Sequence, residues 1–517
     1  MKRRSFLKKS TAFSLPAFLG GFNLSAMAAP MMRNLVNGDD KILILIDLHG
    51  GNDGLNTIFP LDSFDNLANA RPNIIIPQGA LLEINDSLAF HPDMKRAKQM
   101  YDNGTLSIVQ GVGYADQNRS HFRSADIWNT GTTAVESKTT GWLGRYLDDT
   151  FPNYPADYPN ADCPDPFAVT LGRSISGTCQ GIEANYSMAI LNTDDIGGLT
   201  TGVEAPLPND CYGEELGYVV ETFKKSNAYA DQVIAAADTG FSNEYLYSDT
   251  KLSDQLKTVV KFISGGLQTK IYVLTLGGFD THANQVNGDD PATGEHAELL
   301  QTLSEAIFAF QKDLEMQGLQ DRVVGMTFSE FGRKIKSNAG NGTDHGSAAP
   351  MIIFGNCLNA GIIGDNAQIA ANVNINEGVA MQYDFKWVYG SILMDWFGVS
   401  EEKVKMLLTD DFQYLPIIGT CNTIPTSTDD LVSILEAKAF PNPFDQVFTL
   451  SFSILKKEEV RIHLFDVLGK TVRTISNKTF TEGQHNVLVE THSLSSGVYF
   501  ARIEVGNGVK TLRVVKK

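Results

Sequence analysis

The chain has 517 residues, of which 42 are Lys or Arg and 60 are Asp or Glu, so its formal net charge is −18. With 43% hydrophobic and 20% charged residues it is not a disordered or fibrous protein, and its acidity argues against nucleic acid or an anionic membrane as the main partner. The charge is unevenly spread: residues 1–29 carry a net +5, residues 432–517 a net +4, and residues 30–431, with 25 basic and 52 acidic residues, a net −27.

The first 29 residues have the features of an export signal. A basic head precedes an apolar run at residues 12–24, and small residues in an A-x-A arrangement follow, so we expect cleavage after Ala28 or Ala29. The alternative is a membrane anchor, but the run is broken by Pro and Gly and is shorter than the roughly 20 apolar residues that a span needs. Arg3–Lys8 also resembles the twin-arginine export motif, with Lys2 in place of the usual Ser or Thr. No later stretch approaches membrane length.

Apolar runs then alternate with helical patterns along the middle of the chain. Continuous apolar runs predict buried parallel strands at Ile42–Ile46, Leu106–Val109, Ile271–Leu276, Val323–Phe328 and Met351–Phe354. Apolar residues at three- and four-residue spacing predict helices at Leu252–Phe262, Glu298–Met316 and Trp387–Phe397. This alternation predicts an α/β domain at residues 30–423, a doubly wound αβα sandwich with helices on both faces of its sheet.

A candidate nucleophile lies in the loop after Leu106–Val109. Ser120 is flanked there by Arg119 and His121. A serine needs a base or a metal to become nucleophilic, and arginine binds anionic groups through paired hydrogen bonds. The alternative is that Ser120 is the N-cap of a helix at Phe122–Trp128. The two roles are compatible, because a helix N-terminus also favours anions.

Possible metal ligands gather in the loops beside the predicted strands, where ligands of open α/β sheets bind. They are Asp47, His49, Asn52 and Asp53 after the first strand, Asp280 and His282 after the third, and Asp344 and His345 before the fifth. Glu330 and Arg333, after the fourth strand, are expected to support the ligands or to contact substrate. An Asp and a His within three residues, occurring twice, indicate a Zn²⁺ or Mn²⁺ site with mixed oxygen and nitrogen ligands. A single Asp–His pair could instead cap a loop or the N-terminus of a helix. A third alternative is a structural Ca²⁺ site, which coordination by oxygen atoms alone would indicate.

The five cysteines, Cys163, Cys179, Cys211, Cys357 and Cys421, all lie in the middle region. Export permits disulfides, and the spacing fits no zinc-binding pattern. We expect Cys163 to pair with Cys179 or with Cys211.

A polar linker at residues 424–431 separates the middle region from residues 432–517, where short alternating strands at about ten-residue spacing indicate an all-β sandwich. Phe440–Phe444, Leu464–Lys470, Leu494–Phe500 and the Lys-terminated end resemble the type A C-terminal sorting domain of the type IX secretion system. The resemblance implies transport across the outer membrane by the type IX secretion machinery, then secretion or surface attachment with removal of this domain. The alternative is a carbohydrate-binding or adhesive sandwich.

Six short motifs span residues 30–420: Asp47–Gly54, Phe90–Pro92, Ser120–Phe122, Gly278–His282, Ser329–Arg333 and Thr343–Gly346. Together they resemble the secreted family called domain of unknown function fifteen-oh-one, which looks like a branch of the alkaline phosphatase and sulfatase superfamily. That superfamily uses two metals held by Asp and His beside a Ser, Thr or modified Cys nucleophile. The resemblance implies one metal at Asp47, Asp344 and His345, beside Ser120, and another at Asp280 and His282.

The sequence departs from the superfamily in three ways. Asp280-x-His282 replaces the usual Asp-x-x-x-His, no histidine follows His345 before the C-terminal domain, and the sulfatase signature with Cys or Ser before Pro and Arg is absent. One metal, or an altered second site, is therefore as consistent with the sequence as two metals.

These observations predict an exported protein, periplasmic in transit and then secreted or at the cell surface. The predicted activity is metal-dependent hydrolysis of phosphate or sulfate esters of small molecules or glycans, with Ser120 as nucleophile and Arg119 and His121 as further catalytic residues. Five other residues are expected to contact substrate or support the ligands: His49, Asn52, Asp53, Glu330 and Arg333. The alternative is a non-catalytic surface protein that uses the same fold to bind glycans or partners.

Overall fold

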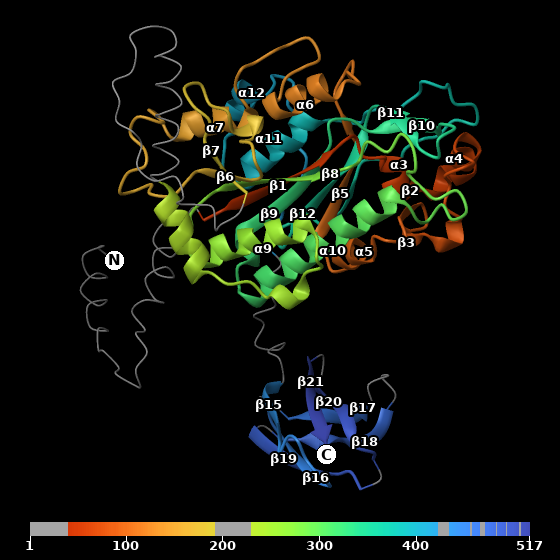
Figure 1. Cartoon of the computed structure of the whole chain (residues 1–517), viewed down its shortest axis with the longest axis vertical. Coiled ribbons are helices and arrows are strands. Elements are labelled where there is room, and N and C mark those ends of the chain that lie inside the picture. The colour runs from red at the N-terminus through yellow and green to blue at the C-terminus, as the bar shows by residue number, and fades with distance from the viewer. Residues whose placement is uncertain are drawn as a thin grey trace. The chain divides into compact units, whose positions relative to one another are not determined.

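The computed structural model describes residues 40–191 and 229–421, and in the C-terminal region residues 434–454, 457–465, 471–481, 483–492, 494–505 and 508–517. The expected export signal, Cys211 and the expected linker at residues 424–431 lie outside the described residues. The chain divides into two compact units, Met1–Cys421 and Asn422–Lys517 (Figure 1). None of the described helices is long and apolar enough to cross a membrane.

A nine-stranded sheet forms the centre of the described part of the first unit. Its order is β13-β5-β12-β9-β1-β8-β6-β7, and β14 pairs with β5. The strands are β1 (Ile42–His49), β5 (Leu106–Gly113), β6 (Ala168–Leu171), β7 (Ser187–Ile190), β8 (Ile271–Gly277), β9 (Val323–Phe328), β12 (Ala349–Gly355), β13 (Gly361–Ile363) and β14 (Tyr383–Asp384). All five apolar runs that were predicted to be strands lie in this sheet.

Helices cover both faces of the sheet, as Figure 1 shows. One face carries α5 (Lys95–Asp102), α9 (Lys251–Ser264) and α10 (Glu295–Met316). The other carries α6 (His121–Thr130), α7 (Trp142–Thr150), α11 (Phe385–Asp395) and α12 (Glu401–Leu407). Successive residues of β1 alternate between the two cores, with Leu43 and Leu45 in one and Ile42 and Ile44 in the other. The predicted αβα sandwich and its three helices are confirmed.

The direction of β12 differs from the prediction. β1 is parallel to β8 and β9, but β12 is antiparallel to both β9 and β5. The connection from β9, residues 329–348, is a hairpin of β10 (Arg333–Ser337) and β11 (Thr343–His345) without a crossover helix, so the chain returns along the sheet in the opposite direction. The first residue of β12 therefore lies at the edge where β1, β8 and β9 end.

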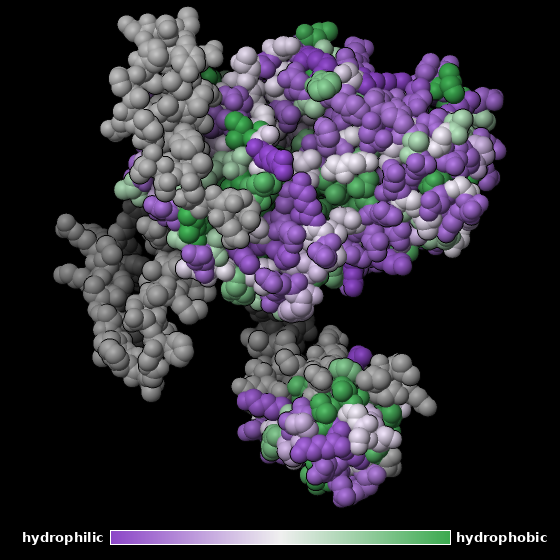
Figure 2. Space-filling model, viewed as in Figure 1, coloured by the Kyte–Doolittle hydropathy of each residue, from purple (hydrophilic) through white to green (hydrophobic). Residues whose placement is uncertain are grey.

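Short elements complete the first unit near this edge. They are α3 (Gly54–Thr57), α4 (Phe64–Ala70) and a three-stranded sheet of β2 (Ile58–Pro60), β4 (Leu88–Phe90) and β3 (Leu82–Asn85). On the face shown in Figure 2, the surface of the unit is mainly hydrophilic, with hydrophobic side chains in separate small groups.

The cysteine pairing also differs from the prediction. Cys357 and Cys421 form a disulfide, whereas Cys163 and Cys179 are free thiols. The backbone explains the pairing, because Leu358 bridges Ile418 in antiparallel fashion and brings the two cysteines together. The expected Cys163–Cys179 pair is wrong.

The second unit is a sandwich of two antiparallel sheets, which confirms the predicted all-β fold. One sheet has β15 (Ile434–Phe440), β16 (Val447–Ile454) and β19 (Gly483–Glu490). The other has β18 (Thr471–Phe480), β17 (Glu458–Phe465), β20 (Gly497–Val505) and β21 (Gly508–Lys516). Alternate residues of β16 and β17, such as Leu450 and Ile462, form a core within this unit.

Candidate metal centre

Five chain segments meet at one edge of the central sheet. The loops after β1, β8 and β9 leave the sheet at this edge, the β10–β11 hairpin lies before β12, and α6 begins in the connection after β5. The strands β8, β1, β9, β12 and β5 are neighbours in the sheet, so the segments are brought together although Asp47 and His345 are 298 residues apart along the chain. Most of the chemically interesting residues of the sequence lie on them.

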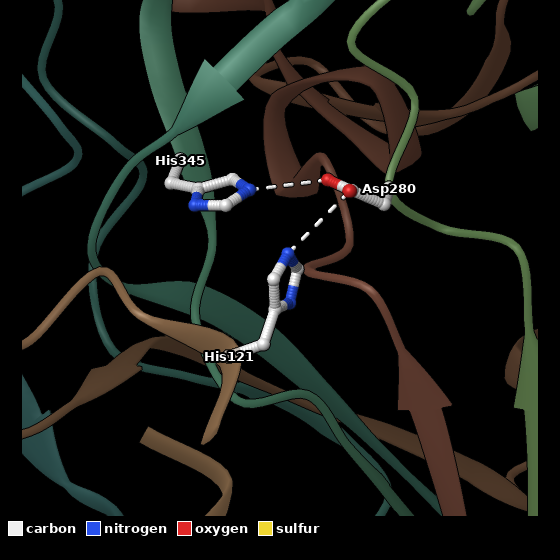
Figure 3. A group of neighbouring side chains, drawn as sticks. All are labelled: His121, Asp280 and His345. Atoms are coloured by element: carbon white, nitrogen blue, oxygen red, sulfur yellow. Dashed lines mark hydrogen bonds and ion pairs between the residues drawn. The ribbon is translucent and has the colours of Figure 1, made fainter. Parts of the chain in front are cut away.

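Two histidines point at one carboxylate in this cluster (Figure 3). The Asp280 Oδ1 atom lies 3.1 Å from His345 Nε2, and Asp280 Oδ2 lies 3.4 Å from His121 Nε2. One potential ligand atom from each of the three residues lies within 4.8 Å of the others. His282 joins them, because its Nε2 atom is 3.2 Å from Asp280 Oδ1 and 2.9 Å from His345 Nε2.

Hydrogen bonds on the far side of each ring fix the histidine tautomers. His345 Nδ1 is 2.8 Å from the carbonyl oxygen of Arg119, and His121 Nδ1 is 2.7 Å from Glu330 Oε1. Both partners accept, so each Nδ1–H donates, and a ring without a second proton keeps a lone pair on Nε2. Those Nε2 atoms face the Asp280 carboxylate, where either a proton on the ring or a cation between the groups makes the contact favourable. Histidines held in this way by a carboxylate or a carbonyl are typical of metal sites.

The charge states suit a metal as well. Partial burial works against ionisation of Asp280, but the hydrogen bond and the positive charge of Arg333 outweigh it and lower the pKa of Asp280 to about 2. Partial burial lowers the pKa of His345, more than its hydrogen bonds raise it. At neutral pH the cluster therefore offers a carboxylate and a neutral imidazole, the forms that bind divalent cations.

Arg333 ties the loops together from behind the cluster. Its side chain is fully buried, and Nη2 donates to Asp280 Oδ1 at 2.7 Å and to the Phe279 carbonyl at 2.9 Å. Nε donates to the Gly51 carbonyl at 2.6 Å and Nη1 to the Thr343 carbonyl at 2.8 Å. Because all three nitrogens are engaged inside the protein, Arg333 orients Asp280 and has no free face for a substrate.

A second group, Asp47, His49 and Glu330, lies beside the first, again with ligand atoms within 4.8 Å. His49 Nδ1 is 3.5 Å from Asp47 Oδ2, and this interaction raises the pKa of His49 to about 9, while burial raises the pKa of Asp47. Glu330 is buried and accepts a hydrogen bond from the backbone N–H of Gly50 at 3.0 Å. In the metal-free protein His49 is therefore a cation beside two carboxyl groups, not a free ligand.

The structure groups the expected ligands differently from the family resemblance. Asp47 lies in the second group and His345 in the first, while Asp344 lies behind His282. Asp344 Oδ1 is 3.3 Å from His282 Nδ1 and Oδ2 is 3.2 Å from Lys334 Nζ, so this carboxylate orients a histidine instead of facing Asp280.

Asn52 and Asp53 are buried below the loop after β1. Asn52 Oδ1 accepts hydrogen bonds from Thr57 Oγ1 and His296 Nε2, and Asp53 pairs with Arg71 at 2.9 Å. Neither residue reaches the surface of the site, so both can act only through the loop that they support.

Ser120 occupies the N-cap position of α6 and is exposed, and its side chain makes no capping hydrogen bond. Both of its neighbours contact the cluster. The Arg119 carbonyl accepts the hydrogen bond from His345 Nδ1, and the His121 ring lies beside Asp280. The Arg119 guanidinium donates to the Asn376 carbonyl at 3.0 Å. Ser120 thus lies next to His121 of the cluster in the chain, and the residue is exposed.

Several residues that support the site carried no signal in the sequence. Arg71, Gln285 and Lys334 belong to no recognisable motif, and each contacts a partner that is remote along the chain or on another strand. His121 was singled out as a catalytic neighbour of Ser120, but its ring is directed at Asp280. These contacts become apparent only when the pairing of the strands is known.

Two regions of the chain match family models. Residues 260–383 match the family described as "Protein of unknown function (DUF1501)", and residues 438–517 match the "Secretion system C-terminal sorting domain". Both resemblances seen in the sequence are thereby confirmed, and the sorting domain indicates export by the type IX system to the cell surface or outside. No curated protein matches the chain.

Three of the solved structures with similarity to this chain cover about nine tenths of its length. A protein in the alkaline phosphatase superfamily from Vibrio parahaemolyticus is 10% identical, with 92% of this chain and 79% of that chain covered and a TM-score of 0.32. A sulfatase from Pseudoalteromonas sp. is 9% identical, with 90% of this chain and 87% of that chain covered and a TM-score of 0.31. A phosphonate monoester hydrolase from Silicibacter pomeroyi is 11% identical, with 92% of this chain and 88% of that chain covered and a TM-score of 0.28. Identities and TM-scores this low say nothing about the activity of this chain.

Proposed function

We propose that this chain is an exported, metal-dependent hydrolase of phosphate or sulfate esters, with one divalent cation, Zn²⁺ or Mn²⁺, held by His121, Asp280 and His345. One observation carries the proposal: a ring nitrogen from each of His121 and His345 and a carboxylate oxygen of Asp280 lie within 4.8 Å of one another, and each imidazole is held by a hydrogen bond at its Nδ1 atom. His282 completes a mixed nitrogen and oxygen set, which excludes a site for Ca²⁺ built from oxygen alone.

The surrounding residues fit an anionic ester. A bound cation would polarise an ester oxygen and lower the pKa of a nearby hydroxyl. Ser120, at the N-terminus of α6, is the proposed nucleophile: its oxygen attacks phosphorus or sulfur and releases the alcohol, and water then removes the group from the serine. His49 is half exposed beside Asp47, and in the metal-free protein it is protonated at neutral pH.

The test combines metal analysis with two generic assays on the full chain. We expect about one Zn²⁺ or Mn²⁺ per chain, and turnover of an aryl phosphate or an aryl sulfate. Asp280→Ala and His345→Ala should lose the metal, whereas Ser120→Ala should keep the metal and lose turnover. Asp254→Asn, an exposed acid on α9, is the control for the change in charge.

Two results would separate the alternatives. A chain without bound metal and without turnover would overturn the proposal. Metal without turnover, with Ser120→Ala indistinguishable from the parent protein, would favour the non-catalytic surface protein that binds glycans or partners.

A further inference from the structure

A buried polar network centred on Gln285 lies behind the metal ligands. The Gln285 side chain is fully buried, five residues after Asp280 in the loop that follows β8. Its Nε2 atom donates to Asp53 Oδ2 at 2.7 Å, and its Oε1 atom accepts from Thr343 Oγ1 at 2.7 Å and from Thr281 Oγ1 at 3.2 Å. One side chain therefore joins three segments that come from different strands.

The chemistry of the partners allows only one orientation of this amide. An ionised Asp53 can only accept hydrogen bonds, so the NH₂ group of Gln285 must face it and the amide oxygen must face the two threonines. Both threonine hydroxyls must then donate. The three hydrogen bonds of Gln285 therefore have fixed directions, and a rotated amide would place its NH₂ group against the threonines and its oxygen against the Asp53 carboxylate.

The network is anchored on β10 by an ion pair. Arg71 Nη1 donates to Asp53 Oδ2 at 2.9 Å, and the two side chains are 0% and 1% exposed. The remaining Arg71 nitrogens donate to the backbone carbonyls of Ile335 and Lys334, each at 2.9 Å. Buried charge-assisted hydrogen bonds are short and directional, so Asp53 offers Gln285 a fixed acceptor.

The two threonines lie beside the metal ligands. Thr281 stands between Asp280 and His282, and Thr343 is two residues before His345. The backbone N–H of Thr343 also donates to the Thr281 carbonyl at 3.2 Å. We propose that Gln285 is a positioning residue that sets the separation of the Asp280–His282 loop from the Asp344–His345 hairpin, and so the geometry of the metal site. This inference rests on the proposed function, since it concerns the metal of that site.

The test measures metal binding and coordination in the full chain, using Zn²⁺ affinity from chelator competition and the visible spectrum of the Co²⁺-loaded protein. Gln285→Leu removes all three hydrogen bonds, and outer-shell changes of this kind cost about 10- to 100-fold in metal affinity. Valine has nearly the same shape as threonine, so Thr343→Val removes one hydrogen bond to Gln285 without creating a cavity. It should give a smaller loss of Zn²⁺ affinity, and it can be measured if Gln285→Leu does not fold. Both should shift the Co²⁺ spectrum, which a purely structural role would leave unchanged.

Gln255→Leu is the matched control. Gln255 is also buried and donates a hydrogen bond, to the Leu171 carbonyl, on α9 away from the ligand loops. It should lower the melting temperature without changing the Zn²⁺ affinity or the Co²⁺ spectrum. Parental affinity and spectrum in both Gln285→Leu and Thr343→Val would overturn this inference and leave the proposed function standing. A parent protein that binds neither ion would overturn both.

Discussion

Two buried histidines near the candidate site, His91 and His296, are held in the neutral form. Burial lowers the pKa of His296 to about 4 and that of His91 to about 3. His296 Nε2 is 2.9 Å from Asn52 Oδ1 and Nδ1 is 3.1 Å from Asn56 Nδ2, so the neutral ring uses one nitrogen as donor and the other as acceptor. A second proton on the His296 ring would point at the NH₂ group of Asn56, which is itself a donor. The contact with Asn56 therefore disfavours the protonated form of His296.

Acid should therefore destabilise the metal-free protein well above the pH at which carboxylates titrate. The unfolded chain binds protons at these histidines near pH 6.5 and the folded chain does not, so the stability is fully present above pH 6.5 and is lost as the pH falls towards 4. For His296 the loss between pH 7 and pH 5 is about 2 kcal/mol. The measurement is the melting temperature at both pH values in the presence of a chelator.

His296→Gln removes the titrating group. The difference between the melting temperatures at pH 7 and pH 5 should therefore be smaller in this variant than in the parent protein. If the variant and the parent protein lose the same stability over this range, His296 is not the residue that responds to acid.

At the scale of the elements, the sequence predicted the strands better than their directions. Each buried strand was visible as an apolar run, because a strand covered on both faces needs no alternation. The reversed direction of β12 was not visible, because direction depends on the connection, and the hairpin at residues 333–345 has no strong apolar pattern. The same limit applies to the site: the Asp–His pairs could be found locally, but which of them face one another depends on strand order.

The loop after β1 can pass the β8 loop only with glycine at position 50. Gly50 has a φ of +123°, and a Cβ atom there would lie 2.3 Å from the backbone nitrogen of Asp280. Gly50→Ala should therefore lower the stability by about 2–4 kcal/mol and weaken metal binding, because it pushes the Asp280 loop away and strains the backbone. Thermal melting and metal content measure the two effects.

Gly79→Ala provides the control for this substitution. A Cβ atom at Gly79 would have nothing within 4 Å, and its backbone is not in the left-handed region. It should change the stability by less than about 0.5 kcal/mol. Equal behaviour of Gly50→Ala and Gly79→Ala would mean that the two loops are free to separate.

At the scale of the whole molecule, composition and periodicity predict a division of the chain near residue 432. The change from helical spacing to alternation near residue 432 marks the two units, and the acidic charge of residues 30–431 coincides with the first of them. The disulfide was not predictable in this way, since Cys357 and Cys421 meet only because residues 358 and 418 pair. Spacing along the chain carries no information about such a contact.

That disulfide leads to a prediction about the separate units. Cys421 is the last described residue of the first unit and is covalently joined to the segment after β12, and the buried core of the second unit consists of its own residues. A chain that ends at Asn422 should therefore keep the melting temperature and the metal content of the first unit. In this truncated chain, replacing both cysteines by serine should cost about 2–4 kcal/mol, because the disulfide closes a loop with a sequence separation of 64 residues. A truncated chain that melts well below the first unit of the intact protein, with the disulfide formed, would show that the second unit stabilises the first.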